Sequence, residues 1–387
     1  MKKIVSTVLA GVMATSLVAC SSGNKATSTT TGGNTATNSD VKVAMVTDYG
    51  DITDQSFNQT TYEASKDWAK DNGADFNYYK PASDADADRE ASIEQAIEDG
   101  YNVIVMPGFA FAKAIVEVTP SYPDTKFVAL DMQQSDLDDA AGGSFEIPDN
   151  LFCAVYKEEI SGYMAGVAAV KLGYKKLGFL GGMAVPSVVR FGYGFVQGAE
   201  AAAKELKLSD VEIKYAYGNQ FFGDADITAR MDTWYNAGTE VVFACGGGIY
   251  TSAAEAASKV NGKVIGVDSD QAPIIDGTYG EGMTVTSATK GLYPTVITTL
   301  DAIKDGKWDD YKGKVATLGL VSADNPADNY VQLADSTQWS DSFTEEDYKE
   351  LVASIFNGDV KVDNTTDEGF IKDYDGSVSV SFEGNIK

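Results

Sequence analysis

The sequence contains no histidine among its 387 residues. This absence excludes the nucleophile systems in which histidine activates a serine or a cysteine, and it removes the most common metal ligand. The sequence also has no Walker A motif and no G-x-G-x-x-G after its first apolar run, so a cradle for a phosphate-bearing cofactor is missing. We therefore predict no metal and no cofactor, and any catalysis would need carboxylates, lysine or tyrosine.

Basic residues are scarce. The sequence has 30 Lys and Arg against 57 Asp and Glu, which gives a formal net charge of −27. A surface of this charge repels phosphate backbones and anionic lipid headgroups. Nucleic acid is therefore excluded as a partner.

Cysteine is also rare, with only Cys20, Cys153 and Cys245 in the chain. Apolar residues flank Cys153 and Cys245, which is typical of buried free thiols. We therefore predict neither a disulfide nor a metal pair at these two positions.

Long hydrophobic runs are absent except at the start of the chain. Lys2 and Lys3 precede an apolar stretch over residues 4–18, about 15 residues long, which is shorter than the ~20 that a membrane-spanning helix needs. The sequence Leu-Val-Ala-Cys at 17–20 resembles the lipobox of bacterial lipoproteins. We expect residues 1–19 to be a signal peptide and Cys20 to carry a lipid that anchors the protein to the extracytoplasmic face of the cell membrane. The alternative is an ordinary cysteine within a cleaved signal peptide.

Residues 21–40 are almost entirely Ser, Thr, Gly, Asn and Ala. Such a segment buries too little apolar surface to offset the entropy of ordering. We predict that residues 20–40 form a flexible tether.

From residue 41 onward, short apolar runs alternate with segments of helical periodicity. The apolar runs that predict strands are 41–46, 103–106, 127–130, 177–180, 241–244 and 264–267. Predicted helices include one opened by a capping box at Ser56 and others at 158–172, 187–206, 226–236, 250–259 and 291–304. This alternation is typical of an α/β fold with doubly wound, mostly parallel sheets, and there are enough units for two lobes.

Three of the predicted strands run directly into an aspartate, namely Asp48, Asp131 and Asp268. Two others run into glycines, at 181–182 and 246–248. Ligands of open α/β sheets bind at the carboxyl ends of the strands, where glycine permits a close approach to the backbone. Each aspartate could instead cap a helix, but all three together favour a ligand site.

Aromatic residues accompany these strand ends, with Phe57 after the first, Phe191 after the fourth, and Phe221 and Phe222 after a further apolar stretch. Such residues could equally belong to the core. Together with the carboxylates, they suit a planar ligand that carries hydroxyl groups.

Several motifs resemble the basic membrane protein family of nucleoside-binding lipoproteins, in the family's order. The first is Val-Thr-Asp-Tyr-Gly at 46–50, followed by Asp-Gln-Ser-Phe-Asn-Gln at 54–59. Later matches are Gly-Phe-Leu-Gly-Gly-Met at 178–183, Gly-Val-Asp-Ser-Asp-Gln at 266–271 and Thr-Ser-Ala-Thr-Lys at 286–290. The resemblance spans about residues 41–362.

This resemblance implies a type I periplasmic-binding-protein fold, which has two doubly wound lobes, a hinge and a central ligand cleft. It implies a substrate-binding lipoprotein of an ABC transporter, with a purine nucleoside as ligand and a permease as partner. We expect a monomer and no enzymatic activity.

The resemblance also implies roles for individual residues. Asp48, Asn58 and Asp131 would serve the base, and Phe57 and Phe222 would stack on it. Asp268 and Lys290 would hold the ribose hydroxyls, while Gly246 would let the backbone approach the sugar. Phe191 completes the predicted ligand-binding residues.

We predict an N-terminal lobe from residues 41–152 with about 287–312, and a C-terminal lobe from 153–286 with about 313–362. Residues 363–387 extend beyond the usual end of the family.

Three other functions compete with this interpretation. A receptor of the same fold could bind another solute, such as a sugar. A nucleoside hydrolase could use Asp48, Asp131 or Asp268 as its base, although such chemistry usually needs a tuned acid or a metal cluster. A purely structural surface lipoprotein would not require Asp, Phe and Gly at successive strand ends.

Overall fold

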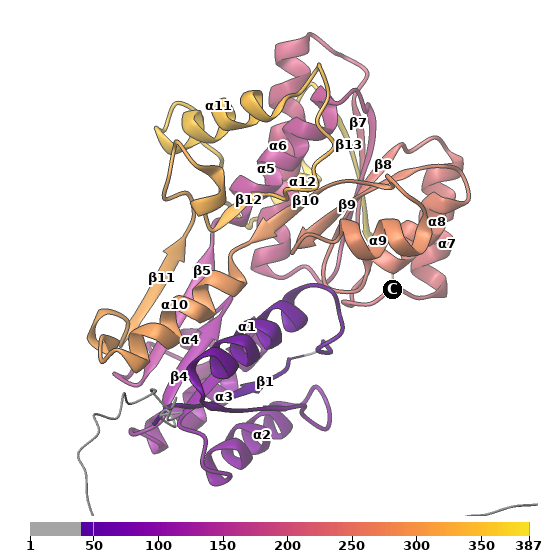
Figure 1. Cartoon of the computed structure of the whole chain (residues 1–387). Coiled ribbons are helices and arrows are strands. Elements are labelled where there is room, and N and C mark those ends of the chain that lie inside the picture. The colour runs from indigo at the N-terminus through magenta and orange to yellow at the C-terminus, as the bar shows by residue number, and fades with distance from the viewer. Residues whose placement is uncertain (1–39, 49, 387) are drawn as a thin grey trace, which may run out of the picture. The chain divides into compact units, whose positions relative to one another are not determined.

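The computed structural model describes residues 40–48 and 50–386, which fold into alternating strands and helices (Figure 1). The predicted signal peptide and Cys20 lie outside the described residues, as does the predicted tether except for Asp40. The strands are β1 Lys42–Val46, β2 Asp75–Tyr79, β3 Val103–Pro107, β4 Lys126–Leu130, β5 Leu151–Tyr156, β6 Lys176–Gly181, β7 Glu212–Tyr217, β8 Val241–Cys245, β9 Lys263–Asp268, β10 Thr284–Lys290, β11 Lys314–Leu318, β12 Val331–Leu333 and β13 Ser379–Asn385. The α-helices are α1 Phe57–Asn72, α2 Asp86–Glu98, α3 Ala112–Val118, α4 Gln134–Ala141, α5 Glu158–Lys171, α6 Pro186–Leu206, α7 Ala225–Asn236, α8 Tyr250–Ser258, α9 Ala272–Tyr279, α10 Leu292–Lys304, α11 Glu345–Phe356 and α12 Gly369–Lys372.

The strands form two sheets with the same internal order. The first sheet runs β11-β5-β4-β3-β1-β2 and the second runs β12-β10-β9-β8-β6-β7-β13. All neighbouring strands are parallel except β10 and β12. In each sheet the chain starts at an inner strand, β1 or β6, and winds outward in both directions. The predicted doubly wound architecture is therefore present twice.

Helices cover both faces of both sheets. Successive side chains of a strand point to opposite faces, so neighbouring residues of one strand pack against different helices. Val43 and Val103 pack with α1, whereas the adjacent Ala44 and Ile104 pack with α2, α3 and α4. Likewise, one face of the second sheet packs against α5 and α6 and the other against α7, α8 and α9. Strands β3 and β8, which are buried on both faces, consist wholly of apolar residues, which explains why they can be recognised in the sequence.

Helices α5 and α6 touch through their backbones at four glycines. A Cβ atom on any of these glycines would lie 2.0–2.2 Å from a carbonyl oxygen of the opposite helix. The contacts pair Gly162 with Phe191, Gly166 with Phe195, Gly194 with Glu159 and Gly198 with Tyr163. No larger residue would permit this approach, so these four glycines set the distance between the two helices.

The chain passes between the sheets at positions that differ from the predicted boundaries. We placed residues 153–286 and 313–362 in the C-terminal lobe, yet β5 and β11 pair with each other in the first sheet. We placed residues 287–312 in the N-terminal lobe; α10 does pack beside α1 (Figure 1), but β10 belongs to the second sheet. The chain thus leaves the first sheet after β5 and after β11, and it leaves the second sheet after β10. An apolar run in the sequence does not indicate which of the two sheets its strand joins.

The C-terminal segment beyond residue 362 is part of the second sheet, because β13 pairs in parallel with β7. Glu200 of α6 holds the approach to β13 by accepting hydrogen bonds from the backbone N–H groups of Ser377 and Val378 at 2.9 and 2.7 Å. At the far end, Glu383 accepts from Arg230 and from the indole N–H of Trp234. The predicted C-terminal extension therefore contains β13, an edge strand that these contacts hold against α6 and α7.

Cys153 and Cys245 are buried free thiols, as predicted. Within residues 40–48 and 50–386, none of the helices combines the length and the apolar character that crossing a membrane requires.

Candidate functional site

The carboxyl ends of strands from both sheets line one cavity. Its walls come from the last residues of β8, β9 and β10 and from the segments that follow β1, β3, β4, β6, β7 and β8, and its volume is about 570 Å³, including the space at its mouth. The order of each sheet reverses between β1 and β3 and between β6 and β8, and these are the points where doubly wound folds bind ligands. The topology therefore creates this cavity.

The structure brings eight of the nine predicted ligand-binding residues to this cavity. They are Asp48, Phe57, Asn58, Asp131, Phe191, Gly246, Asp268 and Lys290. The exception is Phe222, whose side chain is 61% exposed and lies in an adjacent groove. Its neighbour Phe221 lines the cavity instead. Phe221 thus lines the cavity in the place expected for Phe222, and a ligand contact of Phe222 remains a prediction.

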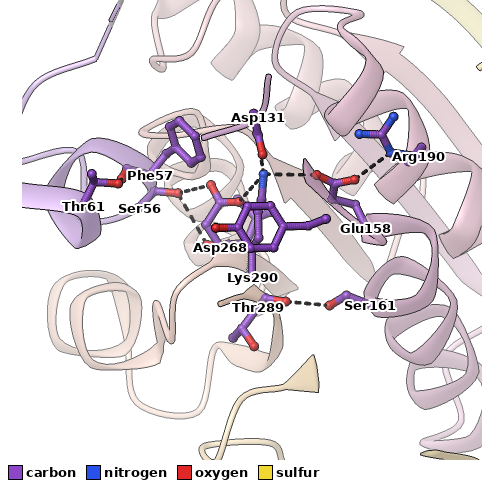
Figure 2. Close-up of polar contacts among 12 residues, drawn as sticks. Ser56, Phe57, Thr61, Asp131, Glu158, Ser161, Arg190, Asp268, Thr289 and Lys290 are labelled. Carbon is purple, nitrogen blue, oxygen red and sulfur yellow. Dashed lines mark hydrogen bonds and ion pairs between the residues drawn. The ribbon is translucent and has the colours of Figure 1, made fainter. Parts of the chain in front are cut away.

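Lys290 lies at the centre of a buried group of charges that we call the Lys290 cluster, which consists of Lys290, Asp131, Asp268 and Glu158. Figure 2 shows its ammonium between the three carboxylates. Lys290 Nζ donates to Asp131 Oδ2 at 2.7 Å and lies 3.5 Å from Glu158 Oε1 and 3.7 Å from Asp268 Oδ1. Behind it, Arg190 Nε donates to Glu158 Oε2 at 2.7 Å. The Lys290 ammonium thus lies near all three carboxylates, and the Arg190 guanidinium pairs with Glu158.

Burial and the neighbouring opposite charges shift the pKa values of the Lys290 cluster in opposite directions. Burial raises the pKa of Asp131 to about 6, and Glu158 and Asp268 add to this effect, while Lys290 counteracts it. Burial alone would lower the pKa of Lys290, but Asp131, Asp268 and Glu158 raise it well above its ordinary value. The ammonium therefore stays charged, and it keeps the neighbouring carboxylates available as hydrogen-bond acceptors.

Two carboxylate oxygens of the cluster, Asp131 Oδ1 and Glu158 Oε1, accept no hydrogen bond from the residues that the structure describes. Both oxygens are buried. An unsatisfied buried acceptor costs about 1–3 kcal/mol, and more when it is charged. Because Asp131 lines the cavity, a ligand hydroxyl or amine can supply the missing donor.

The backbone at the two cavity aspartates that end β4 and β9 is left-handed. Asp131 has φ of 54° and Asp268 has φ of 64°, a region that residues other than glycine rarely adopt. The two residues occupy equivalent places in the two sheets. Such conformations typically cost 1–3 kcal/mol and occur at functional sites.

A second polar group, made of Asp48, Asn58 and Asp54, lines another part of the cavity. Asn58 Nδ2 donates to Asp48 Oδ1 at 2.8 Å and lies 3.2 Å from Asp54 Oδ2. Asp48 has room because residue 108 is glycine, with φ of 117°; a Cβ there would lie 2.4 Å from Asp48 Oδ2. The amide and carboxylate are thus held at fixed positions where they can face a ligand.

The predicted capping box at Ser56 is absent. The Ser56 hydroxyl donates to Asp268 Oδ2 at 2.7 Å, which connects the start of α1 to the end of β9. Asp54 caps α1 instead, because its carboxylate accepts from the backbone N–H groups of Ser56, Asn58 and Gln59. Burial raises the pKa of Asp54 to about 6, although these hydrogen bonds oppose the shift.

Sequence reasoning missed Asp54, Glu158 and Phe109, which contact the predicted residues or line the cavity. Asp54 had a recognisable signal, since an aspartate shortly before a helix is a common cap. Glu158 had none, because Lys-Glu-Glu at 157–159 resembles an ordinary exposed helix start. Its side chain is nevertheless fully buried.

Aromatic rings surround the Lys290 ammonium. Its Nζ lies 4.9 Å from the ring centre of Phe57, 5.5 Å from Tyr156 and 5.6 Å from Phe191. Cation–π contacts at these distances are favourable, particularly where water is excluded.

In residues 40–48 and 50–386, no three Cys, Asp or Glu side chains converge in a geometry that could hold a metal ion.

Comparisons with known proteins agree with this architecture. A solved structure of an ABC transporter solute-binding protein from Aeropyrum pernix K1 aligns with a TM-score of 0.66 and 21% identity, covering 85% of this chain and 94% of that one. The predicted type I periplasmic-binding-protein fold is confirmed.

The sequence comparisons define the family. The ABC transporter nucleoside-binding protein BmpA of Lactococcus lactis subsp. cremoris is 31% identical over 304 residues, covering 73% of this chain and 79% of that protein. An uncharacterized lipoprotein of Pyrococcus abyssi is 26% identical over 304 residues, covering 75% of this chain and 70% of the relative. A family model described as ABC transporter substrate-binding protein PnrA-like matches residues 41–365. The chain therefore belongs to the Bmp family of ABC transporter substrate-binding proteins, confirming the resemblance found in its motifs.

Proposed function

We propose that this protein captures purine nucleosides and delivers them to an ABC transporter permease. The observation that carries the proposal is Asp131 Oδ1, which accepts no hydrogen bond from the described residues and lies beside Asp268 and Lys290 in a cavity with aromatic walls. A ligand that suits this site has a flat ring for the aromatic side chains and two or more hydroxyl donors for the carboxylates. A purine nucleoside has both features.

The two polar groups of the cavity would recognise opposite ends of this ligand. Asp48 and Asn58 offer acceptors and a donor for the edge of the base, while Phe57 and Phe221 stack on its face. Asp268 and Lys290 hold the ribose hydroxyls. The resemblance implied a place for Asp131 on the base side, but its direct contact with Lys290 leads us to assign it to the sugar as well.

The charge of the site favours a nucleoside over its phosphates. Five carboxylates (Asp48, Asp54, Asp131, Asp268 and Glu158) lie in or directly behind the cavity, and Lys290 and Arg190 are the two cations among the residues described there. A phosphate would meet this excess of negative charge in a poorly hydrated site, where repulsion is strong.

The location and partners of the protein follow the same proposal. Cys20 would carry the lipid anchor, the folded part would face the extracytoplasmic side as a monomer, and the two sheets would belong to lobes that close on the ligand by a hinge motion. We propose binding without turnover, so a nucleoside incubated with the protein should be recovered intact.

Substitution of Asp268 tests the proposal. Asparagine tolerates the left-handed backbone, so Asp268→Asn removes the charge and keeps the fold. A hydrogen bond to a charged group is worth about 1.5–3 kcal/mol, so the affinity for adenosine should fall about 10- to 150-fold. Asp309→Asn serves as a control, because the Asp309 side chain is 86% exposed.

Calorimetric titration with adenosine, 2′,3′-dideoxyadenosine, adenine, ribose and a hexose gives the readout. We expect the dideoxy analogue to bind the wild type weakly and to lose little further affinity in Asp268→Asn. Binding of the hexose as tightly as adenosine would favour a sugar receptor. Release of free adenine over many turnovers would identify a hydrolase.

A further inference from the structure

An open groove continues from the cavity toward the protein surface, and we call it the outer groove. Its walls include Asp51 and Lys80, which follow strands β1 and β2 of the first sheet, and Met183 and Phe222, which follow strands β6 and β7 of the second. It encloses about 1040 Å³, including open solvent at its surface. Phe222 is 61% exposed, which is a high exposure for a phenylalanine.

The outer groove joins the cavity at one end only. Gly50, Asp54 and Phe221 line both spaces, so they mark the junction. Asp54 contacts Asn58 directly, which places the junction beside the Asp48 and Asn58 group. Neither Asp268 nor Lys290 lines the groove.

The junction has little room for a side chain of the protein. A Cβ on Gly50 would lie 2.0 Å from Asn58 Nδ2 and 3.0 Å from Asp54 Oδ2. Gly50 therefore packs directly against Asn58 and Asp54, and a larger residue at this position would displace them. At the opposite end, the Lys290 side chain is only 2% exposed and that of Glu158 is fully buried. The groove therefore meets the cavity beside Asp54 and Phe221, and no residue of the Lys290 cluster lines it.

We propose that the outer groove is a second subsite, which takes an apolar ring attached to the base of a purine nucleoside. This inference rests on the proposed function, because it uses the orientation in which the base faces Asp48 and Asn58. A substituent on the edge of the base passes Gly50 and lies against Phe222 and Met183. A substituent of the same size on the ribose meets the buried Lys290 cluster.

The chemistry of the groove walls defines the preferred substituent. Phe222 and Met183 supply a planar ring and a polarizable thioether, both of which favour aromatic partners. The Asp51 and Lys80 side chains are held together by an ion pair of 2.6 Å, so neither presents an isolated charge to the groove. Asp54 and Asp84 also line the groove and give it a negative charge, which disfavours a phosphate. The Phe222 ring and the Met183 thioether favour an uncharged aromatic group.

The test compares three ligands by calorimetry with the purified protein. We expect N6-benzyladenosine to bind within about tenfold of adenosine, and 5′-O-benzyladenosine to bind at least 100-fold more weakly than adenosine. The two substituted ligands carry the same benzyl group, so size and hydrophobicity are matched. Equal losses for both, or a larger loss for the N6 compound, would overturn the inference and leave the proposed function intact.

Two variants localise the effect. Phe222→Ala should weaken N6-benzyladenosine about three- to tenfold through the lost ring contact and leave adenosine within twofold. Phe356→Ala is the matched control, because Phe356 is also exposed, at 45%, and lines neither space. An unchanged affinity of Phe222→Ala for the benzyl compound would remove the groove from recognition. Failure of every purine nucleoside to bind would refute the proposed function and this inference together.

Discussion

Replacement of Lys290 by methionine tests the electrostatics of the cluster most directly. Methionine keeps an unbranched side chain of similar length, so the change removes the charge with little change in packing. The variant leaves Asp131, Asp268 and Glu158 buried without the ammonium that lies 2.7–3.7 Å from them. Removal of one partner from a buried ion pair typically costs 3–5 kcal/mol, a large part of the 5–15 kcal/mol that stabilises most domains.

The loss of unfolding free energy in Lys290→Met should increase as the pH rises. Lys290 lowers the pKa of Asp131 from the value that burial alone would give, so Asp131 titrates above pH 6 in the variant. A carboxyl with a raised folded-state pKa contributes stability at low pH, and this stability is lost as the pH rises toward that pKa. The difference in unfolding free energy between wild type and variant should therefore be larger at pH 8 than at pH 5.5. It should change by about 1.4 kcal/mol per pH unit while one extra proton is bound.

Urea denaturation of both proteins at pH 5.5, 7 and 8 measures this difference. Lys307→Met is the control, because the Lys307 side chain is 64% exposed and its pairing with Asp305 should contribute less than 1 kcal/mol. A penalty for Lys290→Met below about 1 kcal/mol at pH 8, or one that does not change with pH, would refute the reasoning.

Two further substitutions test the elements around the site. Gly108→Ala should displace Asp48 and weaken adenosine binding at least tenfold by calorimetry, whereas Gly142→Ala, also at positive φ but with no atom within 4 Å of the new Cβ, should leave the affinity unchanged. Glu200→Gln should lower the unfolding free energy by about 1–3 kcal/mol at pH 7, because the carboxylate accepts from Ser377 and Val378. Although burial raises the pKa of Glu200, hydrogen bonds from Lys204 and these two residues lower it to about 2, so its contribution is present above pH 4.5 and is lost as the pH falls toward 2. An equal effect of the glutamine variant at pH 7 and pH 2.5 in denaturation experiments would contradict this.

The sequence contained most of the fold because both sheets are buried on both faces. Strands β3 and β8, for example, are uninterrupted apolar runs, and the helices between the strands show ordinary periodicity. Strand β10 is an exception, because it is buried but rich in threonine. The assignment of strands to sheets depends instead on long-range pairing. For β5 and β11, which are separated by more than 150 residues, the local sequence carries no information about their contact.

The site was predictable where chemistry follows directly from the end of a strand, as at Asp48, Asp131 and Asp268. It was not predictable where the direction of a side chain decides, as for Phe221 and Phe222. The role of Ser56 was also misjudged, because a capping serine and a serine that contacts a distant aspartate have the same local sequence.

The close contact between α5 and α6 constrains the hinge motion that we propose for this protein. Four glycine positions fix the separation of these helices, which carry Glu158 at the start of α5 and Arg190 and Phe191 near the start of α6. We therefore expect the two helices to move together as one rigid body and to carry any tilt to the cavity wall. A methyl group added to Gly198, far along α6 from Arg190, would push α5 and α6 apart. It should therefore change ligand affinity from a position that does not line the cavity. The slowest amide exchange in this half of the chain should accordingly lie along the two helices, and the turning points of the opening motion should lie in the segments that connect them to the first sheet.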